Sequence, residues 1–332
     1  MKPAPTLAVF VERFFTQRLM AQRRVSPHTI RSYRDTFRLL LVFVHQRVHK
    51  PPSALALEDV DEPLIAAFLD DLEQRRRNGA RSRNLRLTAI RSFFRYVAYE
   101  APTHAGQIQR ILAMPDKRYV RRLITFLTRA EIEALLAAPD LRTWGGRRDR
   151  AFMLVALQTG LRVSEMTTLQ RHDVRFDAAA HVQCVGKGRK ERCTPLTQQA
   201  VRVLRDWMRE PKRGQTESLF PSARGRQLST DGVQYLLDKH ATVARQACPS
   251  LQQKRVTPHV LRHAAAMELL QAGVDRAVIA LWLGHESVET TQIYLDADLT
   301  LKEEVLAKTT PMAVTPGSFR PNDQLLAFLA SL

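Results

Sequence analysis

Apolar residues recur at three- and four-residue steps through the first hundred positions, which is the spacing of one face of an α-helix. This spacing predicts four amphipathic helices, interrupted at Ser26-Pro27, before Pro63 and at Asn78-Gly79. Ser26 followed by Pro27 is typical of a helix start, with serine as N-cap and proline in the first turn. The predicted apolar stripes contain, in order, Leu7, Phe10 and Phe14; Ile30, Tyr33, Phe37 and Leu40; Leu64, Ile65, Phe68 and Leu72; and Leu85, Ile90, Phe93 and Val97.

Arginines occupy the opposite faces of the second and fourth predicted helices. The chain has 51 Lys and Arg against 33 Asp and Glu, a formal net charge of +18. Because phosphate contacts by basic residues release counterions, this excess indicates a polyanionic partner, nucleic acid before membrane. The alternative is a basic protein whose charge serves solubility alone. Arginine suits phosphates and base edges, and we expect double-stranded DNA to be contacted by Arg31, Arg34, Arg38, Arg81, Arg83, Arg86, Arg91 and Arg95.

The helical period is lost over residues 101–122, which contain two prolines and two short basic runs. A capping-box pattern, Thr128 with Glu131 three residues later, then opens a second set of helices. Two short β-prone runs around Gly186 and Gly188 predict a hairpin within this set. We therefore expect a mainly α protein: an all-helical domain over 1–105, a basic linker over 106–126 with Lys117 and Arg118 on DNA, a mostly helical domain with a small antiparallel sheet over 127–308, and a tail over 309–332.

Three features bear on the compartment. The cysteines Cys184, Cys193 and Cys248 are too few and too scattered for a disulfide framework, which indicates reduced thiols. The longest apolar runs fall far short of the roughly 20 residues of a membrane span. Charged residues interrupt the N-terminus before a signal-like apolar core develops. We expect a cytoplasmic, nucleoid-associated protein without membrane association.

Short segments of the second half carry an unusual set of groups. Arg162 lies just beyond Gly160, a residue suited to ending a helix, and Glu165 is near enough in sequence to hold its guanidinium. The cap Thr257 opens a helix that places His259 and Arg262 one turn apart on one face. The set is completed by Lys187 in the hairpin turn, His285 after a helix end, and Tyr294 nine residues later.

Together such groups can break a phosphodiester. Two arginines can grip the non-bridging oxygens and stabilise charge developing in the transition state. A phenol with a reference pKa near 10 needs cations and a proton acceptor to become a nucleophile. A lysine can protonate the leaving 5′ oxygen. Each residue alone has a structural explanation, as a helix end, a turn or a core aromatic; the combination indicates strand transfer.

The second half resembles the catalytic domain of the tyrosine recombinase (phage integrase) family. The similar segments are TGLRVSE (159–165), GKGRKER (186–192), PHVLRH (258–263), LGH (283–285) and QIYLDAD (292–298), and the first half resembles the family's core-binding domain at 26–43. The resemblance is to Xer-like or transposon-borne bacterial branches.

The resemblance implies phosphate clamps at Arg162 and Arg262, a general acid at Lys187, assistance from His259 and His285, and the nucleophile at Tyr294, with Glu165 and His263 in support. It also implies site-specific recombination through a 3′-phosphotyrosyl link, no metal and no cofactor. The expected assembly is a homotetramer on two DNA sites. We expect the tail of one subunit to pack on its neighbour, and packing on its own subunit is the alternative.

Three alternatives remain open at this point. His259 and His263, four residues apart, could be ligands of a metal hydrolase, although the intervening residues lack a glutamate base. A type IB topoisomerase shares the phosphotyrosyl chemistry, and a catalytically inert DNA-binding protein would share the charge. Cleavage in EDTA separates the first from the recombinase. The target sequence, the choice between integration, excision, resolution and inversion, and any accessory recombinases are not encoded in these patterns.

Overall fold

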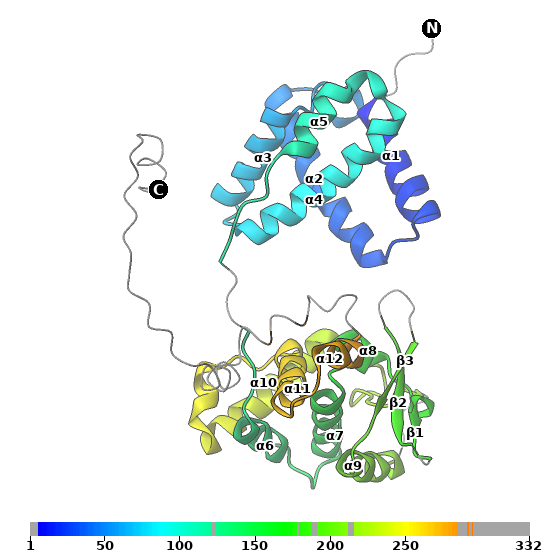
Figure 1. Cartoon of the computed structure of the whole chain (residues 1–332), viewed down its shortest axis with the longest axis vertical. Helices are drawn as coiled ribbons and strands as arrows, with labels where there is room; N and C mark the ends of the chain where they lie inside the picture. The colour runs from blue at the N-terminus through cyan, green and yellow to red at the C-terminus, as the bar shows by residue number, and fades with distance from the viewer. Residues whose placement is uncertain are drawn as a thin grey trace, which may run out of the picture. The chain divides into compact units, whose positions relative to one another are not determined.

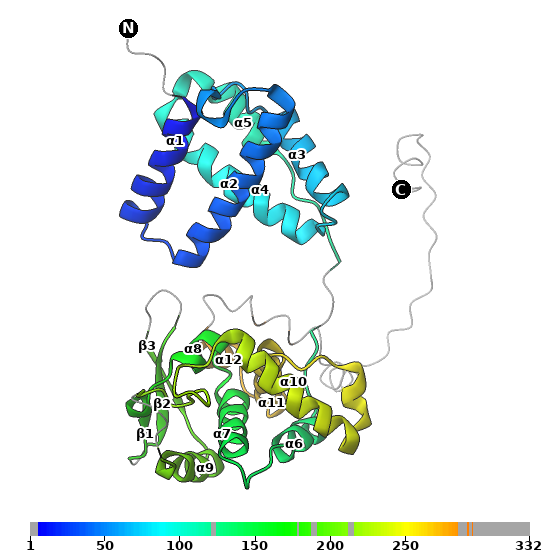
Figure 2. The same ribbon diagram turned by 180° about the vertical axis from the view of Figure 1, so that it is seen from behind.

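The computed structural model of the protein describes residues 6–120, 124–177, 179–186, 191–211, 216–284, 291 and 294. The chain divides into two compact units between Arg121 and Arg122. Figure 1 and Figure 2 show one unit made of helices and one that combines helices with a small sheet, as the sequence predicted. None of the helices within the described ranges is long and apolar enough to cross a membrane.

The N-terminal unit is helical, and all four predicted helices are confirmed. They are α1 (Leu7–Arg13), which continues as the π-helix η1 (Phe14–Gln22), α2 (Pro27–Val48), α3 (Glu62–Gln74) and α4 (Ala80–Glu100). Ser26 caps α2 as expected, its hydroxyl accepting a hydrogen bond from the Thr29 N–H at 3.2 Å. Two 3₁₀ turns, η2 (Pro52–Ala54) and η3 (Pro102–His104), lie between helices.

Aromatic side chains form the centre of this unit. The ring of Phe93 from α4 lies 5.5 Å from that of Phe14 and 5.2 Å from that of Phe37, in edge-to-face geometry. Such aromatic pairs contribute about 0.5–1.5 kcal/mol each beyond the burial of their area. The apolar faces of η1, α2 and α4, which carry Phe14, Phe37 and Phe93, therefore meet in one core.

The prediction that the linker begins at residue 106 is wrong. Residues Ala105–Ala113 form a further helix, α5, and its Ile108 and Ile111 are buried in the core of the N-terminal unit. A nine-residue helix with two buried isoleucines three positions apart offers too little apolar repetition to be recognised from the sequence. The unit therefore extends beyond the expected boundary at residue 105.

In the C-terminal unit the other elements pack around two central helices, α7 (Trp144–Thr159) and α11 (Pro258–Gln271). The other helices are α6 (Arg129–Ala137), α8 (Val163–Thr168), α9 (Gln198–Arg209), α10 (Thr230–Ala247) and α12 (Arg276–Leu283), with 3₁₀ turns η4 (Arg171–Asp173) and η6 (Pro249–Gln253). In both views α7 and α11 lie between the sheet on one side and α6 and α10 on the other (Figures 1 and 2).

The predicted hairpin is present. Strands β1 (Val174–Arg175), β2 (His181–Val185) and β3 (Glu191–Pro195) form an antiparallel sheet in the order β1-β2-β3. Val185 pairs with Glu191, and Cys184 pairs with Arg192. This register places Arg192 second in β3, opposite Cys184 of β2.

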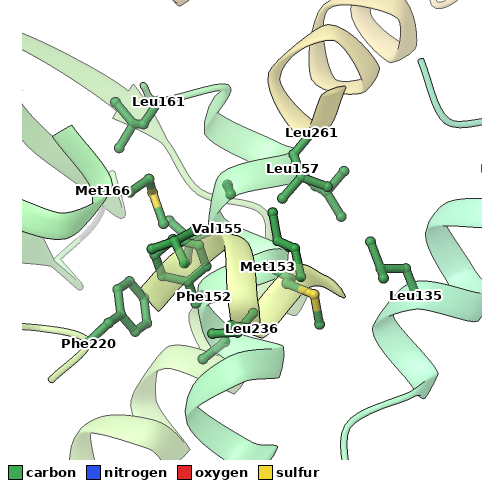
Figure 3. Close-up of a cluster of buried hydrophobic side chains, with 14 of the residues drawn as sticks. Leu135, Phe152, Met153, Val155, Leu157, Leu161, Met166, Phe220, Leu236 and Leu261 are labelled. Atoms are coloured by element: carbon green, nitrogen blue, oxygen red, sulfur yellow. The ribbon is translucent and has the colours of Figure 1, made fainter. Parts of the chain in front are cut away.

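The C-terminal unit has a main apolar core and a smaller apolar cluster that includes residues of α11 and α12 and Tyr294. Figure 3 shows Phe152, Met153 and Val155 of α7 among side chains from α6, α10 and α11. Thr128 and Glu131 form the predicted capping box at the start of α6, since the Thr128 N–H donates to Glu131 Oε2 at 2.8 Å. This packing fixes the ends of α7, α8, α11 and α12, where the predicted site residues lie.

Candidate active site

The turn between α7 and α8 positions Arg162. Gly160 ends α7 with φ of +60°, and a Cβ at this position would collide with the side chain of Leu283. Both the left-handed backbone and the close approach therefore require glycine. Arg162 follows as the N-cap residue of α8, and its own N–H donates to Glu165 Oε2 at 2.7 Å.

Glu165 lies between two guanidiniums. Its Oε1 accepts a hydrogen bond from Arg162 Nη1 at 3.0 Å, and its Oε2 accepts one from Arg192 Nη2 at 2.7 Å. The Glu165 side chain is only 4% exposed. The expectation that Glu165 holds Arg162 is thus met by a direct ion pair, and the structure adds a second arginine that the sequence interpretation did not include.

Three arginines converge on the C-terminal end of α12. Arg262 donates from Nη1 to the Gly160 carbonyl at 2.6 Å and from Nη2 to the Leu283 carbonyl at 2.8 Å. Arg162 Nη2 donates to the Gly284 carbonyl at 3.0 Å, and Arg192 Nη1 also donates to the Leu283 carbonyl. The free carbonyls of a helix end carry partial negative charge, so this end offsets the repulsion among the guanidiniums.

Arg262 remains charged at neutral pH. Burial, reinforced by the charge of Arg162, lowers the pKa of Arg262 to about 10. That value still leaves the group protonated at pH 7. The segment 160–165, strand β3, α11 and the end of α12 therefore assemble a positive site, in which Glu165 forms ion pairs with Arg162 and Arg192.

Tyr294 lies in a buried position beside these groups. Its side chain is 1% exposed, and its hydroxyl is 3.2 Å from Nδ1 of His263. Burial raises the pKa of Tyr294, while the charges of Arg262 and Arg162 oppose the rise. Burial also lowers the pKa of His263 to about 4, with His259 and Arg262 contributing. His263 is then neutral at pH 7, and its Nδ1 can accept the phenol hydrogen.

The other expected site residues divide into two groups. His259 precedes His263 by one turn of α11, and the two rings stack with centroids 6.5 Å apart. Lys187 and His285 lie outside the described residues, as does the tail over 309–332. Within the described ranges, no group of three or more His, Cys, Asp or Glu residues is placed to hold a metal ion.

The arginines of the N-terminal unit are not equivalent. Arg31, Arg34 and Arg38 on α2 and Arg81 and Arg95 on α4 are exposed, as are Lys117 and Arg118.

Three of the five α4 arginines that we expect to contact DNA are partly or fully buried. Arg83 is 8% exposed and lies 3.8 Å from Glu73. Arg86 donates to the Ser32 carbonyl at 3.1 Å, and Arg91 donates to Asp116 at 3.0 Å. These side chains connect elements of the unit, because α4 packs on its neighbours with more than its apolar stripe.

Comparison with known proteins agrees with this geometry. Residues 125–300 match the phage integrase family, and residues 11–101 match the phage integrase N-terminal SAM-like domain. The chain is 63% identical over 327 residues to the Sinorhizobium fredii protein y4rC, which is named as an integrase/recombinase, covering 98% of each chain. It is 33% identical over 309 residues to tyrosine recombinase XerC of Pelobacter propionicus, covering 92% of this chain and 96% of the relative.

A solved structure shares the fold at low sequence identity. The lambda integrase tetramer bound to a Holliday junction superposes with a TM-score of 0.62 at 21% identity, over 87% of this chain and 78% of that chain.

Proposed function

This chain belongs to the phage integrase family of tyrosine recombinases, and we propose that it breaks and rejoins DNA strands at specific sites with Tyr294 as the nucleophile. The observation that carries the proposal is the convergence of Arg162 and Arg262 on the end of α12 next to the buried Tyr294. Two fixed guanidiniums beside a phenol match the needs of phosphotyrosyl transfer.

In the proposed reaction the phenol oxygen of Tyr294 attacks phosphorus. A P–O bond to tyrosine forms, the P–O5′ bond breaks, and the 3′ end of the strand stays on the enzyme. The phenol proton passes to a histidine, and Lys187 gives a proton to the 5′ oxygen. Arg162 and Arg262 bind the non-bridging oxygens and stabilise their charge. Attack by the 5′ hydroxyl of another strand on the phosphotyrosine reverses these steps and releases Tyr294.

Double-stranded DNA is the proposed partner. The exposed arginines of α2, together with Arg81, Arg95, Lys117 and Arg118, supply phosphate contacts in this proposal. Two strands must be exchanged between two duplexes, and the proposed assembly is a homotetramer, as in the lambda integrase complex of the same fold.

The proposed subunit contact places the tail of one copy on the C-terminal unit of another. A groove of about 540 Å³ beside α6, α7, α11 and α12 has apolar lining residues Ile132, Leu136, Leu154, Leu157, Leu269 and Trp282. The tail carries matching apolar residues at Leu325, Leu326, Phe328 and Leu329. A chain ending at residue 308 should then bind a single DNA site but fail to form the tetramer in sedimentation.

The direct test is covalent capture. We would incubate the protein in EDTA with nicked duplexes tiled across the DNA that flanks its gene, and separate the products on a denaturing gel. A protein–DNA band that the wild type forms and Tyr294→Phe does not form is the expected result, since the substitution removes only the hydroxyl. A band that persists in Tyr294→Phe would place the nucleophile elsewhere.

A further inference from the structure

Arg192 of strand β3 lies at the junction of the groups that orient both proposed phosphate clamps. We propose that Arg192 is a positioning residue, which holds Arg162 and Arg262 in the geometry that grips the scissile phosphate. The inference rests on the proposed function, because it assigns Arg192 a role in that same reaction.

The first line of argument is the sharing of anchors. Arg192 Nη2 donates to Glu165, the carboxylate that also binds Arg162. Arg192 Nη1 donates to the Leu283 carbonyl, the same oxygen that accepts from Arg262 at 2.8 Å. One guanidinium therefore touches the anchor of each clamp, and it reaches them from a third segment of the chain.

The second line of argument is burial. The Arg192 side chain is 12% exposed, compared with 29% for Arg162. Both terminal nitrogens of Arg192 already bind protein oxygens. A group enclosed in this way is held in one place, so it is suited to fixing its neighbours.

The third line of argument is the close approach at Gly284. A Cβ on Gly284 would collide with Arg192 Nη1, and Gly284 has φ of +64°. The Arg192 guanidinium therefore sits directly against the turn that ends α12 and presents the Gly284 carbonyl to Arg162. Arg192 therefore supports two elements of the site: the turn at Gly284 and the carboxylate of Glu165.

Removing the guanidinium should loosen both clamps. In Arg192→Met, Glu165 would keep only Arg162, and the Leu283 carbonyl would keep only Arg262. Small displacements of groups that stabilise a transition state cost large factors in rate, so we expect cleavage to slow by roughly 10- to 100-fold. Arg192→Lys keeps the charge but cannot reach both partners with a fork of N–H donors, and it should be intermediate.

The experiment compares two substrates with each variant. One is the nicked duplex that the wild type cleaves in the capture assay, and the other carries a methylphosphonate at the scissile position, which removes one negative charge. A variant with weakened clamps has less charge to stabilise on the methylphosphonate, so its defect relative to wild type should shrink. A variant that is merely less folded loses the same factor on both substrates.

The reference variants are Arg162→Ala and Arg262→Ala. The matched control is Arg245→Met, since Arg245 is a half-buried arginine of the same unit that donates to the Leu251 and Lys254 carbonyls at 3.2 Å. We expect the defect of Arg192→Met to shrink at least about 5-fold on the methylphosphonate, as for the reference variants. Arg245→Met should cleave both substrates like the wild type.

Two results would overturn the inference in different ways. If the reference variants are relieved and Arg192→Met is not, Arg192 supports folding alone. If neither reference variant is relieved, the clamp assignment is wrong and the role of Arg192 falls with it.

A second measurement does not depend on knowing the DNA site. Inorganic phosphate at millimolar concentration should raise the urea midpoint of the wild type and of Arg245→Met, because it binds the folded clamps. A reduced rise in Arg192→Met, close to that of the Arg162→Ala, Arg262→Ala double variant, supports the inference. A rise equal to that of the wild type contradicts it.

Discussion

Replacing Glu165 by glutamine should destabilise the DNA-free protein while changing almost nothing in side-chain volume. The carboxylate accepts three hydrogen bonds: from the Arg162 N–H, from Arg162 Nη1 and from Arg192 Nη2. A glutamine oxygen in the place of Oε2 can keep the first and third of these. Its amide N–H₂ group would then face Arg162 Nη1, another donor.

The magnitude follows from these contacts. Two charge-assisted hydrogen bonds become ordinary ones, and a third is replaced by the repulsion of two donors. Since Glu165 is only 4% exposed, water cannot compensate the change. Breaking a buried ion pair by removing one partner costs roughly 3–5 kcal/mol, and we expect the free energy of unfolding to fall by that amount.

Tryptophan fluorescence during urea unfolding measures this loss in the relevant unit. The chain has 3 tryptophans, Trp144, Trp207 and Trp282, and all of them belong to the C-terminal unit. The control is Glu133→Gln, because Glu133 is 64% exposed in its ion pair with Arg129. Exposed pairs contribute about 1 kcal/mol or less. If Glu165→Gln changed stability as little as Glu133→Gln does, the carboxylate would not organise the arginines, and our account of the site would be wrong.

Three further predictions concern other parts of the molecule. Gly284→Ala should slow cleavage by at least about 10-fold in the capture assay, because the new Cβ would displace Arg192 and strain the backbone; a wild-type rate would contradict this. The pKa of His263 falls to about 4 on folding, so the unfolded chain binds a proton that the folded chain does not, and stability is lost as pH falls from about 6.5 to 4. The loss attributable to this histidine should be about 3 kcal/mol and should disappear from the fluorescence-detected urea unfolding of His263→Gln; an unchanged acid slope would refute it. Arg38→Ala should reduce the salt dependence of DNA binding by about one phosphate contact without affecting stability, whereas Arg86→Ala should lower the melting temperature of the helical unit seen by circular dichroism; equal effects of the two would show that exposure does not distinguish them.

Much of the fold could be predicted because it depends on periodicity and on local caps. The stripe from Ile30 to Leu40 has to face a core wherever α2 packs, and Ser26 caps the helix through atoms three residues away. The hairpin likewise follows from two β-prone runs around a turn rich in glycine. These signals are local, so one sequence is enough to read them.

The contacts that organise the site are of another kind. Arg192 and Arg262 both bind the backbone carbonyl of Leu283. Every residue has such a carbonyl, so the residue types do not indicate which one accepts these hydrogen bonds. His263 and Tyr294 are 31 positions apart in the sequence, and their contact depends on how α11 packs in the folded unit. The burial of Arg83 arises in the same way, since helix periodicity shows which face is apolar but does not show which polar residue turns inward.

The arrangement also explains how the same arginines can be held firmly and still bind a phosphate. A guanidinium has five N–H donors in a rigid plane. Arg162 uses Nη1 for Glu165 and Nη2 for the Gly284 carbonyl, and Arg262 uses its two terminal nitrogens for the carbonyls of Gly160 and Leu283. Each side chain still has N–H groups to offer, because each terminal nitrogen carries two. Hydrogen bonds from some of the N–H groups fix the plane of each guanidinium before DNA binds. The arginines therefore need little reorganisation when charge develops on the phosphate. A lysine in either position would have to choose between its anchor and the phosphate, and for this reason the site depends on arginine in both places.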